Sequence, residues 1–215
     1  MAPSDLLNPE KARIFRITHR DNVPWILENG LHAKNGSHSD PNFRPIGSRD
    51  LILKRHDHPV PVGPCGTLSD YIPFYFTPFS MMLLNIKTGF NGVPKFPNEE
   101  IVILVSSLRR AAAMEIPFVF TDLHAYLRLT HHFTDLAQLD GIDWPLLQSK
   151  DFKRDDNDPG KTDRYQAEAL IWKYLPVEAL EGICCYTETV RDGLKAKANE
   201  LGRALNIVKT SSWYF

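Results

Sequence analysis

The sequence predicts an α+β fold with a largely antiparallel sheet and flanking helices. Seven short runs rich in β-branched and aromatic residues recur along the chain, and the helical stretches between them do not alternate with them in a regular way. The length of 215 residues, of which 43% are hydrophobic, suits one domain with a sizeable core. We therefore expect a single domain over residues 1–215.

The predicted strands are residues 14–18, 72–76, 101–105, 118–121, 169–172, 182–186 and 206–208. The first helix is expected at 21–29, with Asp21 as its N-cap and Gly30 just beyond its end. Apolar residues at helical spacing predict further helices at 80–87, 106–114, 134–139 and 189–205.

Two stretches are expected to be irregular. Residues 33–67 contain five prolines, and residues 149–164 are dense in Asp and Lys. Loops of this length are uncommon inside a compact domain and often serve as lids or binding segments. A surface insertion without function is the alternative, and the sequence leaves both open.

Composition limits the class of protein and its location. The net charge of −1 gives no overall attraction to nucleic acid, so any such binding must come from local basic patches. The three cysteines, Cys65, Cys184 and Cys185, have the spacing of neither a disulfide framework nor a zinc site. We expect a cytoplasmic protein without metal, signal peptide or membrane span.

Four blocks resemble the DarT family of ADP-ribosyltransferases. They are Phe15-Arg-Ile-Thr-His19 with the helix after it, Gly66-Thr-Leu-Ser-Asp-Tyr-Ile-Pro-Phe-Tyr-Phe76, Pro117-Phe-Val-Phe-Thr-Asp-Leu-His124, and Gln166-Ala-Glu-Ala-Leu-Ile-Trp172. The ending Trp213-Tyr214-Phe215 is also similar to that of the family. The resemblance thus covers nearly the whole chain.

The resemblance implies an ADP-ribosyltransferase fold, in which a split antiparallel sheet binds NAD in its cleft. It also implies transfer of ADP-ribose to a base of single-stranded DNA, with thymine preferred over guanine. Such a protein is the toxin of a toxin–antitoxin pair whose partner is a macrodomain antitoxin, and we expect it to be a monomer. The alternatives are a guanine-specific, RNA or protein ADP-ribosyltransferase, or a non-catalytic module that binds NAD or nucleic acid.

Glu168 and Arg55 are the expected catalytic residues. Cleavage of the nicotinamide glycosidic bond builds positive charge on the ribose, which a nearby carboxylate stabilises. The resemblance assigns this role to Glu168, which by itself would read as an exposed strand-edge residue. It also places a catalytic arginine at Arg55, although Arg49 and Lys54 lie close by. Because a guanidinium stays charged, Arg55 is expected to polarise the target base or to neutralise a developing anion.

The expected NAD contacts lie mostly in the first and second of the four blocks, with Arg55 between them. They are Arg16, Ile17, Thr18, His19, Asn22, Gly30, Leu31, Arg55, Tyr75 and Phe76. The polar residues among them would hold the amide or the ribose hydroxyls, or would simply cap the following helix. Arg16 departs from the family, which often has a histidine at this position, so its backbone is an alternative contact.

The expected DNA contacts are His124, Lys153, Arg154, Arg164 and Tyr165. Most lie in the loop before Glu168, where cations attract phosphates and aromatic rings stack on bases. Aspartates in the same loop offset the cations, so we expect the basic side chains to gather on one side of it.

Overall fold

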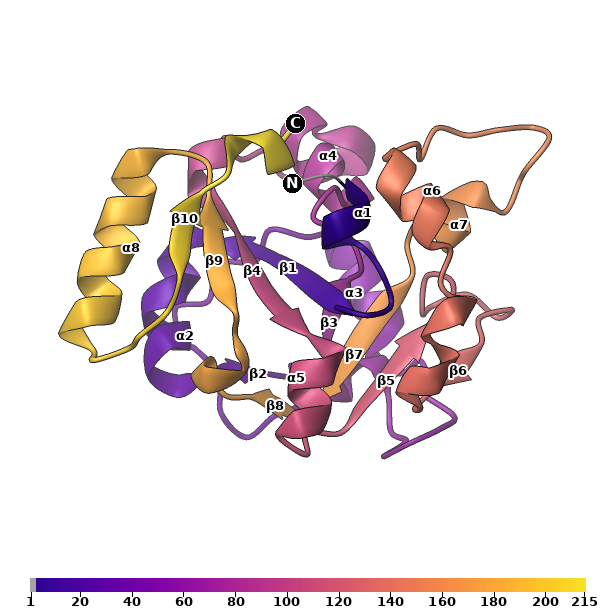
Figure 1. Cartoon of the computed structure of the whole chain (residues 1–215), viewed down its shortest axis with the longest axis horizontal. Helices are drawn as coiled ribbons and strands as arrows, with labels where there is room; N and C mark the ends of the chain where they lie inside the picture. Colours follow the sequence, from indigo (N-terminus) through magenta and orange to yellow (C-terminus); the bar gives the residue numbers. More distant parts are fainter. Residues whose placement is uncertain (1–2) are drawn as a thin grey trace.

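The computed structural model describes residues 3–215 and centres on an eight-stranded sheet with flanking helices (Figure 1). The order of its strands is β10-β9-β4-β1-β3-β7-β5-β6, and every neighbouring pair is antiparallel except β9 with β10. The bounds are β1 Arg13–His19, β3 Tyr71–Tyr75, β4 Ile101–Ser107, β5 Phe118–Thr121, β6 His132–Phe133, β7 Glu168–Trp172, β9 Gly182–Cys185 and β10 Ile207–Lys209. A small second sheet pairs β2 (Leu31–His32) with β8 (Tyr174–Leu175).

The helices lie around this sheet. The α-helices are α1 Pro3–Leu6, α2 Val23–Asn29, α3 Arg49–His56, α4 Met81–Thr88, α5 Leu108–Ala113, α6 Trp144–Ser149, α7 Lys161–Arg164 and α8 Glu188–Glu200. The 3-10 turns are η1 Arg20–Asn22, η2 Leu68–Asp70, η3 Phe90–Gly92, η4 Asn98–Glu100, η5 Leu136–Gly141, η6 Val177–Ala179 and η7 Ser211–Trp213.

The seven predicted strands are confirmed, whereas the helix predictions need correction. The helix predicted from residue 106 begins at Leu108, because residues 106 and 107 extend β4 and the Ser107 hydroxyl caps the helix. The stretch predicted at 134–139 is the 3-10 turn η5. The last helix ends at Glu200, before a turn in which Gly202 has a φ of 65°. Near residue 21 the N-cap is His19, whose ring accepts the N–H of Asp21.

The sheet divides between β1 and β3. Strand β1 pairs with β4 along its whole length, and β3 pairs with β7 at five positions. Between β1 and β3, in the part of the chain that the structure describes, the pairing is confined to Phe15 and Tyr75. Away from this pair the two strands separate, which opens the cleft of the molecule. The fold class, a split and mainly antiparallel sheet with helices around it, is confirmed.

The core explains why the strands are so recognisable in the sequence. All seven residues of β4 are buried, which fits its unbroken apolar run in the middle of the sheet. Helix α2 buries Val23, Ile26 and Leu27, and α8 buries Val190, Leu194 and Ala198. The cleft between β1 and β3 is thus bounded by strands that belong to a rigid, well-packed sheet.

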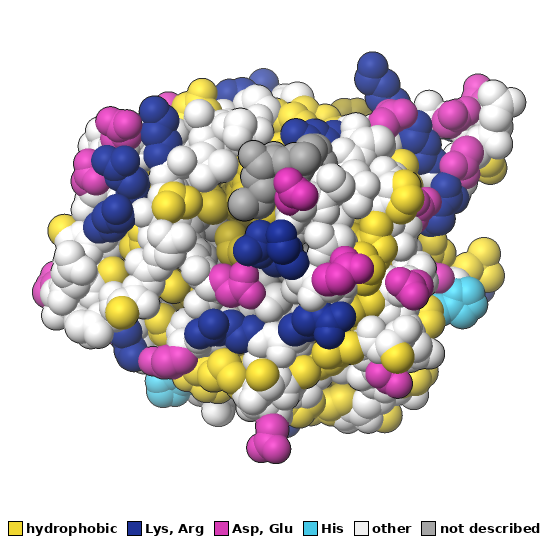
Figure 2. All heavy atoms as spheres, viewed as in Figure 1, with side chains coloured by type: hydrophobic (Ala, Val, Ile, Leu, Met, Phe, Trp, Pro, Cys, Tyr) yellow, Lys and Arg dark blue, Asp and Glu magenta, His cyan; other side chains and the backbone are white. Residues whose placement is uncertain are grey.

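The surface in view in Figure 2 carries basic and acidic side chains in alternation, with no broad region of one sign. This agrees with the near-neutral net charge. In residues 3–215, no helix is long and apolar enough to cross a membrane.

Candidate active site

An ion pair between Glu168 and Arg55 lies at the edge of the cleft. Glu168 is the first residue of β7, opposite Tyr75 of β3, and only 2% of it is exposed. Arg55, in the last turn of α3, donates from Nη1 to Oε1 and from Nη2 to Oε2 of Glu168, both at 2.8 Å. Two parallel hydrogen bonds of this kind fix the plane of the carboxylate as well as its position.

Neighbouring backbone and side chains hold Glu168 in place. Its N–H donates to Thr121 Oγ1 at 3.1 Å, and the hydroxyl of Thr121 donates to the carbonyl of Leu123 at 2.7 Å. The N–H of Ala125 donates to Oε1 at 3.2 Å, and His124 Nδ1 lies 3.4 Å from the same oxygen. The carboxylate therefore has a fixed orientation before any substrate arrives.

The charge state of Glu168 follows from opposing effects. Burial alone would raise the pKa of Glu168, but the positive charge of Arg55, the nearby His124 and the hydrogen bonds from Arg55 and Ala125 more than offset it. The pKa of Glu168 therefore lies below its ordinary value. The group is an anion at neutral pH, as stabilisation of a cation requires.

Helix α3, which carries Arg55, lies within the stretch expected to be irregular. Ser48 caps it by accepting the N–H of Leu51, and none of its residues is fully buried, although only 13% of the Arg55 side chain is exposed. Of the three cations that the sequence left open, Arg55 reaches Glu168, whereas Arg49 and Lys54 are exposed. Burial would lower the pKa of Arg55, yet the charge of Glu168 raises it above its usual value.

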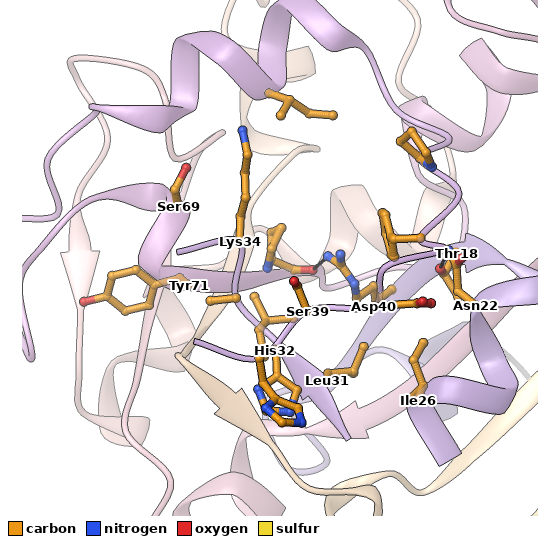
Figure 3. A pocket seen from close by; sticks show the side chains of 18 of the residues that line it. Thr18, Asn22, Ile26, Leu31, His32, Lys34, Ser39, Asp40, Ser69 and Tyr71 are labelled. Carbon is orange, nitrogen blue, oxygen red and sulfur yellow. Dashed lines mark hydrogen bonds between the residues drawn. The ribbon is translucent and has the colours of Figure 1, made fainter. Parts of the chain in front are cut away.

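A pocket of about 390 Å³ opens in the split of the sheet (Figure 3). Among the expected NAD contacts it is lined by Arg16, Thr18, Asn22, Leu31 and Arg55. Most of the remaining wall comes from α2, from residues 32–45, and from β3 with the turn before it. The structure thus brings five of the expected residues together around one cavity beside Glu168.

Arg16 offers a free hydrogen-bond donor in this pocket. Its Nη1 donates to the carbonyl of Pro73 on β3 at 2.8 Å, across the split, and its buried Nε has no partner in residues 3–215. Burial lowers the pKa of Arg16 to about 10, so the side chain stays a cation at neutral pH. A buried unpaired donor is costly, which indicates a site for a ligand.

Asn22 and Thr18 fasten the loop that borders the pocket. Asn22 Oδ1 accepts the N–H of Arg44 at 2.8 Å, while Nδ2 donates to the carbonyl of Arg44 and to Thr18 Oγ1, both at 3.0 Å. Asn22 thus pairs with Arg44 as a neighbouring strand would. Its side chain shapes the pocket wall and has little capacity left for a ligand.

The structure corrects the side-chain roles expected for His19 and Phe76. His19 is fully buried, and its ring contacts the N–H of Asp21 and, at 3.1 Å, the carboxylate of Glu100. Phe76 is also fully buried and packs edge-on against core aromatic rings. Neither lines the pocket, because both side chains are buried in the core.

Three other residues that were expected to contact NAD also lie outside the lining of the larger pocket. Gly30 ends α2 in a turn with a φ of 80°, Ile17 packs against the hydrophobic core, and neither residue lines the pocket. Tyr75 borders a second, smaller cavity beside Glu168. Burial and Glu168 raise the pKa of Tyr75 to about 12, so its hydroxyl remains protonated.

The expected DNA contacts are also only partly available. Tyr165 is 1% exposed and donates its hydroxyl to the carbonyl of Phe79, so the structure does not fit the stacking role expected for it. Arg164 is held by Asp158 at 2.6 Å and by Asp143 at 3.0 Å. By contrast, Lys153 and Arg154 are exposed in the loop before α7. His124 lies beside the carboxylate of Glu168.

Sequence reasoning missed Thr121 and an aromatic group in the pocket. Thr121 belongs to the block Pro117–His124, but its contact with Glu168 depends on the pairing of β5 with β7. Trp25, His32 and His38 have ring centroids 5.3 to 6.2 Å apart, and all three line the pocket. No local sequence pattern joins these three residues, because they come together only when α2, β2 and the loop after β2 pack against one another.

The split antiparallel sheet, with a buried carboxylate at the start of β7 and a cavity between β1 and β3, defines an ADP-ribosyltransferase. The family model described as DarT, ssDNA thymidine ADP-ribosyltransferase, matches residues 15–215. The chain belongs to the DarT family. The recognition, the fold and the NAD-dependent class of enzyme expected from the sequence are thereby confirmed.

Relatives and solved structures agree with this assignment. A DNA ADP-ribosyl transferase of Escherichia coli O127:H6 is 56% identical over 209 residues, which cover 97% of this chain and 96% of the relative. The DarT of Thermus sp. 2.9 in complex with ADP-ribosylated ssDNA is 32% identical, with a TM-score of 0.88 and coverage of 96% and 98% of the two chains. The same Thermus protein in complex with NAD+ has a TM-score of 0.80.

Proposed function

We propose that this protein transfers ADP-ribose from NAD to a thymine base in single-stranded DNA and releases nicotinamide, with Glu168 and Arg55 as the catalytic pair. The observation that carries the proposal is the bidentate ion pair at the edge of the split sheet, beside a pocket of about 390 Å³. The family, the fold and the site point to the same chemistry.

Glu168 acts on the NAD side of the reaction. As the bond between the ribose and nicotinamide breaks, positive charge develops on the ribose, and a fixed anion lowers the energy of that state. Its carboxylate oxygens accept further hydrogen bonds, so Glu168 also orients the ribose through a hydroxyl. Because Thr121 and Ala125 hold the residue, little reorganisation is needed during the reaction.

Arg55 acts on the base. The base atom that bonds to the ribose loses a proton to solvent, and negative charge develops on the ring as it does so. The guanidinium of Arg55 stabilises that charge and polarises the base without giving up its own proton, since its pKa is raised by Glu168. The ion pair therefore places opposite charges at the two ends of the bond that forms.

The pocket has the chemistry that NAD requires. Arg16 and Lys34 supply positive charge for a pyrophosphate, and the free Nε of Arg16 is a ready donor. Trp25, His32 and His38 offer ring faces for a planar heterocycle. These are the residues that we propose for binding NAD, together with Thr18, Asn22 and Leu31 around them.

The exposed Lys153 and Arg154 are the proposed contacts for the DNA backbone, because their charges are open to solvent. On the strength of the family resemblance, we further propose that the protein is the toxin of a toxin–antitoxin pair. It would act as a monomer in the cytoplasm, and a macrodomain antitoxin would reverse the modification. Co-expression with such a hydrolase should restore growth, and unchanged toxicity would reject this part.

The proposed activity is tested with labelled NAD and a set of short oligonucleotides. Single-stranded DNA with thymine should accept the label, whereas the same strand without thymine, its duplex and the matching RNA should not. The variant Glu168→Ala should lose transfer by about a thousandfold while the protein stays folded. Label on RNA or protein but on no DNA would contradict the proposal, as would full activity of the variant.

A further inference from the structure

A second cavity, of about 160 Å³, lies close to the catalytic pair. Helix α3 and its cap border both cavities: Ile52 and Arg55 line the larger pocket, whereas Leu51 and the cap residue Ser48 line the smaller one. Tyr75, opposite Glu168 in the sheet, is also part of the small cavity. The ion pair of Arg55 and Glu168 therefore lies where the two cavities approach each other.

The small cavity differs from the large one in the polar groups that it presents. Asn85 of α4 and Asn91 of η3 line it, and within residues 3–215 neither side-chain amide has a hydrogen-bond partner. Gln166 also lines it and donates from Nε2 to the carbonyl of Thr162, which leaves its own carbonyl oxygen open. Three side-chain amides thus border one small space beside Glu168.

The backbone at Asn91 supports a binding role for its side chain. Asn91 has a φ of 53° and lies between Gly89 and Gly92, which also have positive φ values. Left-handed backbone at a residue other than glycine is uncommon, although asparagine tolerates it better than most. Such conformations gather at functional sites, where the surrounding structure maintains them. Here the unusual turn brings an amide to the wall of the cavity.

The shape and chemistry of the small cavity suit one pyrimidine. A volume of about 160 Å³ is roughly five times that of a water molecule in the liquid, enough for one planar ring. Met82 and Tyr75 provide surfaces for the face of a ring. His124 also lines the cavity, and its Nδ1 lies 3.2 Å from the backbone N of Tyr126 and 3.4 Å from Oε1 of Glu168.

Side-chain amides distinguish thymine from cytosine by their N–H groups. Thymine has a carbonyl oxygen where cytosine has an amine, so an amide that presents its N–H at this position matches thymine, and one that presents its carbonyl matches cytosine. We propose that the small cavity receives the acceptor base and that Asn85 and Asn91 select thymine there. The inference rests on the proposed transfer to DNA and adds the residues that determine its specificity.

The test compares Asn85→Asp and Asn91→Asp with Asn199→Ala, a control on the exposed surface of α8. An aspartate keeps the shape of asparagine but has no N–H to donate, so folding should be preserved; the melting temperature checks this. Each variant is assayed for transfer to a strand with one thymine and to a strand with one cytosine. Binding of NAD alone is measured by calorimetry.

Each aspartate variant should lower kcat/KM for the thymine strand about tenfold or more. The ratio of kcat/KM for the thymine strand to kcat/KM for the cytosine strand should therefore fall. Affinity for NAD should stay within about twofold of wild type, and the control should match wild type in every assay. An unchanged ratio, or a loss of NAD affinity equal to the loss of transfer, would overturn the inference. If the wild-type protein modifies no DNA strand, the proposed function itself fails.

Discussion

The two members of the ion pair between Glu168 and Arg55 are held in opposite ways. Glu168 begins a central strand, is almost fully buried, and is fixed by hydrogen bonds to Thr121 and Ala125. Arg55 lies at the end of α3, a helix without a fully buried residue, and its two side-chain hydrogen bonds both go to Glu168. The difference indicates that the sheet fixes the anion, and that the anion in turn positions the cation.

The largest effect on stability should come from removing the cation. Arg55→Ala leaves a buried carboxylate without its partner, at a cost of about 3 kcal/mol in the free energy of unfolding. Glu168→Gln should cost clearly less, because the Arg55 side chain is then free to turn toward solvent from its exposed helix. Urea unfolding of both variants measures the two losses in the free energy of unfolding. Equal losses would contradict the claim that the two residues are held in different ways.

The same pair predicts a dependence on pH. In the wild-type protein the pKa of Glu168 is lowered, so the stability that it contributes is present above the unfolded pKa of about 4.3 and is lost as the pH falls through the folded pKa. Loss of Arg55 raises the folded pKa. The destabilisation of Arg55→Ala should therefore be greatest at neutral pH and should shrink on acidification; a constant difference would exclude this explanation.

The role of the Thr121 hydroxyl in holding Glu168 is tested by Thr121→Val. Valine keeps the shape but leaves the N–H of Glu168 and the carbonyl of Leu123 without their partner, which should cost about 2 kcal/mol in the free energy of unfolding. Thr121→Ser restores the hydroxyl and should recover most of the loss. Thermal unfolding of the two variants measures the loss of stability and its recovery. Equal stability of the valine and serine variants would show that the hydroxyl has no such role.

The loop that precedes α3 is tested by Asn22→Ala. Removal of the amide leaves the N–H and carbonyl of Arg44 unpaired, with an expected cost of about 1.5 kcal/mol. Amide hydrogen exchange at Arg44 should become faster, and affinity for NAD should fall about tenfold because the pocket wall is loosened. Unchanged exchange at Arg44 would mean that other contacts hold the loop.

The smallest effect is expected from Ser48→Ala, which removes the cap of α3. Loss of a cap costs about 1 kcal/mol of helix stability, but α3 buries no residue, so the melting temperature should hardly change. Transfer should fall several-fold, because Arg55 is less well placed, and Ser48→Thr should retain it. A large loss of global stability would show that α3 belongs to the core after all.

The contrast between these regions also explains what the sequence could predict. The strand of Glu168 was predictable because its apolar run and motif are local, and so was the carboxylate at its start. Helix α3 was not, since none of its residues is buried and it therefore has no apolar stripe to recognise. The two-residue strands β2, β6 and β8 are too short to leave a pattern.

Burial of individual side chains was the other limit. Tyr165 and Phe76 were expected at binding surfaces from their motifs, yet their long-range contacts with Phe79 and Phe120 place them in the core. The clamp between Asn22 and Arg44 joins residues whose contact no local pattern encodes. Such contacts depend on the tertiary fold, which propensity and periodicity do not reveal.

The most direct test of the central claim, that Arg55 and Glu168 form one catalytic unit, is a double-mutant cycle. Single-turnover transfer to a thymine strand is measured for wild type, Glu168→Gln, Arg55→Lys and the double variant. Residues that act as a unit give losses that do not add, so the double variant should be within about twofold of the slower single variant. A loss equal to the product of the two single losses would contradict the account.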